Sequence, residues 1–206
     1  MKFPLDLRRR PEVDPRVVHQ AAAWCLSYPD ESFVDALSTI ARALHEQPAD
    51  EAVERLLGFV DGTRDRPLTD LQEEYVAVFD LSRKHALYLS YWTDGDTRRR
   101  GEVLGTFKQR YRDSGFLVDT HGELPDYLPL VLEFAATVDP QAGAELLQEY
   151  RPSVELLRIA LREMESPYAL VVEAICATLP GASPRDRAEV MRMAGLGPPS
   201  EKVGLA

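Results

Sequence analysis

Hydrophobic residues recur along this chain at intervals of three and four, the spacing of a helix with one buried face. In the first such segment Val18, Ala21, Ala22 and Cys25 follow the pattern i, i+3, i+4, i+7. Asp14-Pro15 precedes them, and an aspartate followed by a proline is typical of a helix start. We therefore expect a helix that begins at Pro15 and ends before Tyr28-Pro29.

The same spacing predicts further helices along the rest of the chain. Their ranges are 30–44, Ala49–Val60, Pro67–Phe79, Thr97–Tyr111, Glu123–Thr137, Pro140–Tyr150, Pro152–Met164, Pro167–Leu179 and Pro184–Ala194. Pro140–Tyr150 and Pro152–Met164 are either two helices or one helix bent at Pro152. Only Leu87–Trp92 and Phe116–Val118 have a pattern that would also suit a short strand.

These patterns predict an all-α protein with one compact, bundle-like domain of about eight to ten helices. We expect this domain to cover residues 14–196. Residues 1–13 are expected to form a flexible basic tail, and residues 197–206, which include Gly197-Pro198-Pro199, a disordered one.

Composition excludes several classes of protein. The 206 residues carry 24 Lys and Arg against 34 Asp and Glu, a net charge of −10, so we expect no nucleic-acid partner. The longest uncharged run, Val17–Pro29, is shorter than the ~20 residues that cross a bilayer. Arg8-Arg9-Arg10 is followed by proline and acids instead of an apolar export segment, which favours a cytoplasmic location without direct membrane insertion.

No motif for catalysis or for a cofactor is present. The sequence lacks GxSxG, GxxxxGK[ST], HExxH and GxGxxG, and its four histidines are scattered. Cys25 and Cys176 are too far apart for a CxxC site, and each lies on or beside a hydrophobic helix face. We therefore expect a protein that is not an enzyme and holds no metal or cofactor, with a helical metalloenzyme as the weaker alternative.

Charge is segregated along the chain. Pro67–Asp80 holds four acids without a Lys or Arg, and Leu117–Tyr150 holds seven, whereas Thr97–Arg112 carries six basic residues and one acid. If Glu123–Thr137 is one helix, Glu123, Asp126, Leu130 and Glu133 lie on one stripe.

Two interpretations of this stripe stay open. It is either a solvated face paired with the basic helix, or a receptor for a cationic amphipathic segment. A pair of catalytic carboxylates is a weaker interpretation, because nothing in the sequence indicates a raised carboxyl pKa.

Five sequence blocks occur in an order that resembles one known family. They are AAAWCLSYPDESF (Ala21–Phe33), LQEEYVAVFDLS (Leu71–Ser82), HALYLSYW (His85–Trp92), GDTRRRG (Gly95–Gly101) and ELPDYLPLVLEFAA (Glu123–Ala136). They resemble the nitrate reductase delta-subunit family of molybdenum-cofactor assembly chaperones, which is related to the twin-arginine redox-enzyme maturation chaperones.

The resemblance implies an all-helical, cytoplasmic chaperone without turnover of its own. Its partner would be the apo catalytic (alpha) subunit of respiratory nitrate reductase, bound through the N-terminal segment of that subunit. Binding would assist insertion of the molybdenum cofactor and delay docking to the membrane subunit. We expect a monomer or a weak dimer. The alternative is an all-helical scaffold or regulatory adaptor unrelated to nitrate reductase.

The family's peptide-binding motif maps onto one segment of this sequence. The residues implied are Glu123, Pro125, Asp126, Tyr127, Leu130, Glu133 and Phe134, with Tyr75, Phe79, Tyr88 and Leu89 as the facing wall. Asp126 would meet a basic group of the partner, while Leu130 and Phe134 would contact its apolar face. Many relatives have histidine after the motif aspartate, and Tyr127 at this position removes the imidazole that would make binding depend on pH.

Overall fold

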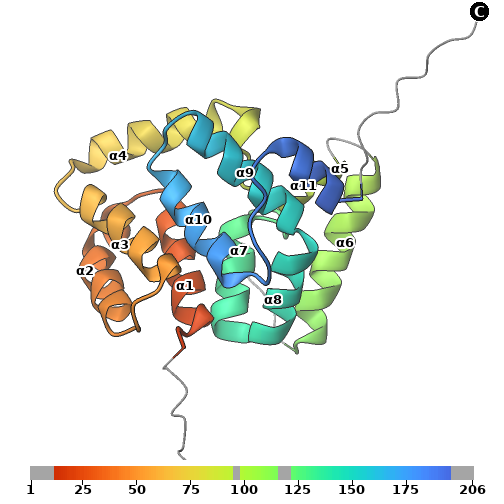
Figure 1. Ribbon diagram of the computed structural model, residues 1–206, viewed down its shortest axis with the longest axis horizontal. Helices are drawn as coiled ribbons and strands as arrows, with labels where there is room; N and C mark the ends of the chain where they lie inside the picture. Colours follow the sequence, from red (N-terminus) through yellow and green to blue (C-terminus); the bar gives the residue numbers. More distant parts are fainter. Residues whose placement is uncertain (1–11, 95–97, 116–121, 196–206) are drawn as a thin grey trace, which may run out of the picture.

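The computed structural model describes residues 12–94, 98–115 and 122–195, and in these ranges the chain is all-α, as predicted (Figure 1). The first half contains α1 (Pro15–Leu26), α2 (Glu31–His45), α3 (Glu51–Thr63), α4 (Leu68–Tyr75) and α5 (Leu89–Asp94). The second half contains α6 (Arg98–Asp113), α7 (Leu128–Glu133), α8 (Pro140–Glu149), α9 (Arg151–Glu163), α10 (Tyr168–Thr178) and α11 (Arg187–Met193). The expected tails 1–13 and 197–206 lie almost wholly outside the described residues; Val13 is described and packs against the core.

Aspartates begin many of the helices, as the sequence indicates. The side chains of Asp14, Asp30 and Asp50 accept hydrogen bonds from backbone N–H groups in the first turns of α1, α2 and α3. Asp139 and Asp186 do the same for α8 and α11. Each cap satisfies a backbone donor that has no partner within its own helix.

The core forms around α10, a helix that is hydrophobic nearly all round. Among its eleven residues Tyr168, Val171, Val172 and Ile175 are buried, and the helix packs against α1, α3 and α9. Figure 1 shows α10 crossing the middle of the molecule, with α2 and α3 at one end of the long axis and α6 at the other. A helix without a polar face is stable only when neighbours cover every side of it.

Two short π-helices follow α4 and α7 without a break. They cover Val76–Asp80 and Phe134–Val138. The second packs against α8, where Gly143 comes so close to Ala135 that a Cβ at position 143 would overlap the Ala135 Cα and Cβ atoms. The glycine therefore fixes the distance between these two elements.

The expected helix over Glu123–Thr137 is wrong in its first part. The segment before Leu128 is not helical, so the stripe of Glu123, Asp126, Leu130 and Glu133 on one helix face does not exist. In the run Leu87–Trp92, whose pattern would also suit a short strand, residues 89–92 belong to helix α5 and Tyr88 forms an isolated antiparallel bridge with Tyr127. Phe116–Val118, the other run with such a pattern, lies outside the described residues.

A buried ion network, which no sequence pattern indicated, ties α9 to the connection between α10 and α11. Glu155 is fully buried and bonds both Arg151 and Arg158, which are also buried. Arg151 donates to the carbonyls of Pro180 and Gly181, and Arg158 donates to that of Pro184. These carbonyls and the Glu155 carboxylate accept hydrogen bonds from the two buried guanidinium groups.

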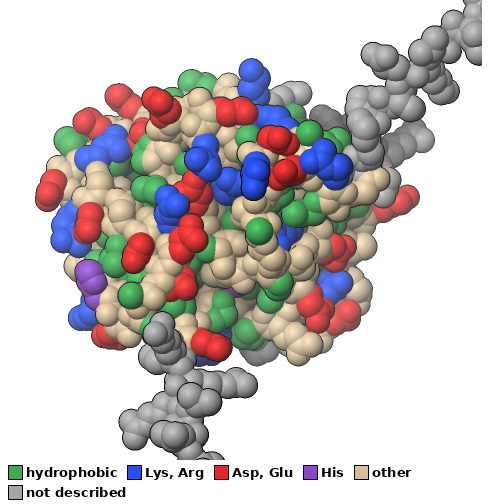
Figure 2. Space-filling view, viewed as in Figure 1, with side chains coloured by type: hydrophobic (Ala, Val, Ile, Leu, Met, Phe, Trp, Pro, Cys, Tyr) green, Lys and Arg blue, Asp and Glu red, His purple; other side chains and the backbone are tan. Residues whose placement is uncertain are grey.

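Surface charges of both signs are mixed. Over α3, α9 and α10, Figure 2 shows Lys and Arg beside Asp and Glu, and Glu173 there pairs with Arg55 and Arg162. The basic helix α6 pairs with α8 through Arg110, which bonds Glu145 and Glu149. No helix in the described part of the chain has the length and apolar character needed to cross a membrane.

Candidate functional site

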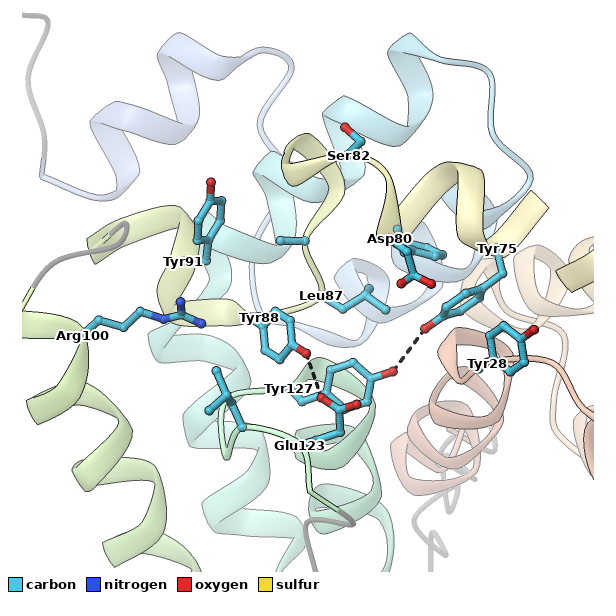
Figure 3. A pocket seen from close by; sticks show the side chains of 13 residues that line it. Tyr28, Tyr75, Asp80, Ser82, Leu87, Tyr88, Tyr91, Arg100, Glu123 and Tyr127 are labelled. Carbon is cyan, nitrogen blue, oxygen red and sulfur yellow. Dashed lines mark hydrogen bonds between the residues drawn. The ribbon is translucent and has the colours of Figure 1, made fainter. Parts of the chain in front are cut away.

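Two adjoining hollows open where α1 ends and α7 begins. The first has a volume of about 570 Å³ and the second about 290 Å³. Both are lined by Tyr28, Glu123 and Tyr127, so they adjoin at these residues, and together they are here called the aromatic groove. Figure 3 shows the first hollow, whose walls come from segments far apart in the sequence.

The groove is held in shape by the pairing of residues 87–89 with residues 126–128. The Leu128 N–H donates to the Leu87 carbonyl at 2.7 Å, and the Leu89 N–H donates to the Asp126 carbonyl at 3.0 Å. This pairing places the rings of Tyr88 and Tyr127 side by side, with centroids 5.6 Å apart. The backbone hydrogen bonds thus bring two of the predicted site residues, Tyr88 and Tyr127, into contact.

Tyrosine hydroxyls connect the opposite walls. Tyr75 donates to the Leu26 carbonyl at 3.1 Å and lies 3.2 Å from the Tyr127 hydroxyl, while Tyr88 donates to Glu123 at 2.7 Å (Figure 3). Burial raises the pKa of Tyr75, Tyr88 and Tyr127 above that of a free phenol. The groove therefore keeps neutral hydroxyl groups at physiological pH, and these groups can both donate and accept hydrogen bonds.

The rim of the groove is acidic. Asp30, Asp80, Glu123 and Glu133 line one or both hollows and are exposed. Among the described residues that line the groove, Arg100 alone carries a positive charge, and its guanidinium lies 5.8 Å from the ring centres of Tyr88 and Tyr91. An acidic rim around aromatic walls suits a ligand with basic and apolar groups.

Asp126 does not face this groove, which corrects the expected contact with a basic group of a partner. Its side chain is fully buried, and one carboxylate oxygen accepts from the Ser90 backbone N–H at 3.0 Å and from the Ser90 hydroxyl at 2.6 Å. Arg100 lies 3.9 Å from the same oxygen. Because Ser90 lies in the first turn of α5, Asp126 caps that helix from a distant part of the chain.

Three other predicted residues are also interior. Leu89 and Phe134 are nearly inaccessible, and Phe134 packs on Tyr111 with ring centres 4.8 Å apart. Pro125 is buried, and its carbonyl accepts a hydrogen bond from Tyr111. The expected contacts of Asp126 and Phe134 with a partner are therefore wrong, because both side chains are buried in the interior.

The remaining predicted residues meet at the groove. Tyr75, Phe79, Tyr88, Glu123 and Tyr127 line the first hollow. Leu130 and Glu133 join Glu123 and Tyr127 at the second. Seven of the eleven candidates thus line the aromatic groove.

Sequence analysis missed many of the residues that line the groove, among them Trp24, Tyr28, Asp30, Asp80 and Arg100. Tyr28 stands at the shared wall and Trp24 in the second hollow, although the sequence suggested only a helix end there. Asp80 and Arg100 line the first hollow. The position of Trp24 on the polar side of the first predicted helix could have indicated a binding surface, because a large aromatic side chain gains little by facing solvent.

Comparisons with known proteins agree on one family. A family model described as "Nitrate reductase delta subunit" matches residues 42–172. The nitrate reductase-like protein NarX of Mycobacterium tuberculosis H37Rv is 42% identical over 162 residues, which cover 79% of this chain and 24% of NarX. The chain thus spans about a quarter of that relative's length.

Two further similarities cover nearly the whole of the matched protein. A chain of Bacillus subtilis described as a nitrate reductase molybdenum cofactor assembly chaperone, NarJ, is 34% identical over 176 residues, 85% of this chain and 95% of NarJ. The crystal structure of a chain described as a redox enzyme maturation protein from Archaeoglobus fulgidus matches with a TM-score of 0.60 at 22% identity, over 84% of this chain and 96% of that one. The second similarity concerns the fold alone.

Proposed function

Because this chain belongs to the nitrate reductase delta-subunit family, we propose that it is a cytoplasmic assembly chaperone for a respiratory nitrate reductase. Its partner is the apo form of the catalytic (alpha) subunit, bound through the N-terminal segment. While that segment is held, the molybdenum cofactor is inserted and docking to the membrane subunit is delayed. The chain contributes binding and no chemical turnover.

One observation supports this proposal above the others: aromatic walls and an acidic rim surround the two adjoining hollows of the groove. The walls include Tyr28, Phe79 and Tyr88, and the rim carries Asp30, Asp80, Glu123 and Glu133. A cationic amphipathic segment matches both properties, since its apolar side chains pack on rings while its Lys or Arg side chains approach the carboxylates.

The acidic rim and the aromatic walls contribute different free energies to peptide binding. An exposed ion pair contributes about 0–1 kcal/mol, so the rim alone does not hold a peptide. Burial of apolar side chains contributes about 25 cal/mol per Å², which makes the aromatic walls the main source of affinity. The rim selects basic segments and speeds their approach.

Calorimetry with a synthetic peptide of the alpha-subunit N-terminus from the same organism tests the proposal. We expect Glu133→Lys and Tyr28→Ser, both at exposed positions of the groove, to weaken binding about tenfold or more. Glu54→Lys is the matched control, because it makes the same charge change on α3 away from the groove. The proposal is wrong if the peptide does not bind, or if all three variants bind it as the wild type does.

A further inference from the structure

A third hollow lies beside α1 and adjoins the second hollow of the aromatic groove. It has a volume of about 390 Å³, lies between α1, α2 and the π-helix Phe134–Val138, and shares Gln20 and Trp24 with the second hollow. We call it the α1–α2 hollow. The second hollow therefore adjoins the first on one side and the α1–α2 hollow on the other.

One face of α1 lines the second and third hollows. Val17, Gln20 and Trp24 are spaced by three and four residues, so they lie on one stripe of this helix, and Tyr28, just beyond the end of α1, lines the first two hollows. At 1.5 Å per residue the stripe from Val17 to Trp24 is ~10 Å long. That length suits several consecutive residues of an elongated ligand.

The α1–α2 hollow differs chemically from the aromatic groove. Its walls are mainly small or aliphatic side chains, which include Ala36, Ile40, Ala43 and Ala136. Its two charged residues, Asp14 and Arg16, pair with each other at 2.9 Å. The hollow therefore offers apolar surface without a free charge among its described lining residues.

Two side chains at the junction have properties that suit a bound ligand. Trp24 is 38% exposed, although it is the largest apolar side chain on α1. The amide oxygen of Gln20 is buried and has no hydrogen-bond partner within the described residues. A ligand that lies along the stripe would cover the indole ring, and its backbone N–H groups would supply donors for this amide.

We propose that the α1–α2 hollow is a second, apolar subsite for the client segment that the aromatic groove receives. This inference rests on the proposed function. The occupant is the apolar stretch next to the basic residues of that segment. Acids that pair with no cation of the described chain line the first two hollows, whereas Asp14 at the third is paired with Arg16 and the other walls there are mainly apolar. Recognition is then bipartite: the client's cations lie at the acidic rim and its apolar side chains lie against Trp24 and Ile40.

Trp24 provides a direct readout of occupancy. The chain has two tryptophans, so Trp92→Phe leaves Trp24 as the single emitter. We expect the alpha-subunit peptide to shift Trp24 emission to shorter wavelength and to protect the indole from acrylamide. A peptide with its apolar stretch replaced by serine should bind at least tenfold more weakly and should leave the emission unchanged.

Filling the hollow tests the same inference by kinetics. Ala43→Phe places a ring in the hollow from a half-buried position, and Ala144→Phe on the exposed face of α8 is the matched control. We expect Ala43→Phe to speed peptide dissociation about tenfold and to leave the association rate nearly unchanged. Ala144→Phe should change neither rate.

The outcomes separate this inference from the proposed function. If the peptide binds and Glu133→Lys weakens it, while Trp24 emission and the dissociation rate of Ala43→Phe stay as in the parent protein, the subsite is wrong and the chaperone role stands. If no peptide binds, both are wrong. Removal of residues 1–11, or dilution of the free protein, should leave Trp24 emission unchanged; a change would identify the chain's own N-terminus or a second copy as the occupant and would overturn the inference.

Discussion

Asp126 shows how one side chain can look like a binding residue and serve as a structural one. Its carboxylate accepts two hydrogen bonds from Ser90, and its backbone carbonyl accepts one from Leu89, so it joins the loop before α7 to the start of α5. The neighbouring Tyr127 and Tyr88 take their places in the aromatic groove through the same pairing. Asp126 therefore affects the groove by positioning its walls.

We expect Asp126→Ala to destabilise the fold by about 2–4 kcal/mol, because it removes two buried hydrogen bonds from Ser90 and the negative charge beside Arg100. Asp126→Asn should cost less, since its amide oxygen still accepts from Ser90. Urea unfolding measures both values. Equal stability of Asp126→Ala and the wild type would contradict this structural role.

Protonation of His19 at low pH should destabilise the fold. It is buried, its Nε2 lies 2.9 Å from the Thr178 hydroxyl, and burial lowers its pKa to about 4, with Asp14 opposing the shift. The unfolded chain takes up this proton near the ordinary pKa of about 6.5. The stabilising contribution is therefore complete above pH 6.5 and is lost as the pH falls toward 4.

The loss assigned to His19 between pH 7 and pH 4 is about 3 kcal/mol, from about 1.4 kcal/mol for each unit of pKa difference. We expect His19→Gln to lose correspondingly less stability over this range, as measured by urea unfolding at several pH values. His45→Gln, at an exposed position, is the control and should keep the wild-type dependence. Identical pH curves for His19→Gln and the wild type would contradict the assignment.

At the scale of elements, the contact of α8 with the π-helix Phe134–Val138 depends on Gly143. A methyl group there would overlap Ala135, so Gly143→Ala should destabilise the protein by about 2 kcal/mol or more, although alanine favours helices. Gly105→Ala on α6 is the control, because a Cβ there has no neighbour within 4 Å. It should stabilise by about 0.5–1 kcal/mol in the same thermal or urea measurement. If Gly143→Ala were the more stable of the two variants, α8 would be able to move away from the π-helix without loss of stability.

The elements also show what the sequence could predict. Helices such as α1, α2 and α3 follow from an apolar period and an aspartate cap, which are local properties. The structures of Leu87–Trp92 and Glu123–Tyr127 do not follow from local patterns, because their backbone groups bond to each other across more than thirty residues. The spacing of hydrophobic residues along the chain does not reveal such a long-range pairing. Candidate residues such as Tyr75, Tyr88 and Tyr127 therefore lie at the groove, whereas Asp126 and Leu89, which take part in that pairing, lie in the interior.

At the scale of the whole molecule, Glu155 connects the helical core to the C-terminal helix. It balances Arg151 and Arg158, whose other donors bond the Pro180, Gly181 and Pro184 carbonyls. Glu155→Gln leaves two buried guanidinium groups without a counter-charge, so we expect a loss of about 3–5 kcal/mol in urea unfolding. Glu163→Gln, which removes an exposed pair with Arg187, is the control and should change little. Similar values for both variants would mean that water reaches the network.

The net charge of −10 attracts any cationic partner through solvent before the two make contact. Salt at 0.15 M reduces the screening length to about 8 Å, so attraction across solvent weakens while apolar contacts within the groove do not. We therefore expect the association rate of the alpha-subunit peptide to fall about tenfold between 0.02 M and 0.5 M salt, with a nearly constant dissociation rate in stopped-flow fluorescence. A peptide with glutamine in place of its Lys and Arg residues should associate slowly at every salt concentration. An equal salt dependence of both rates would mean that the ion pairs at Glu123 and Glu133 hold the bound peptide, and would overturn the assignment of affinity to the aromatic walls.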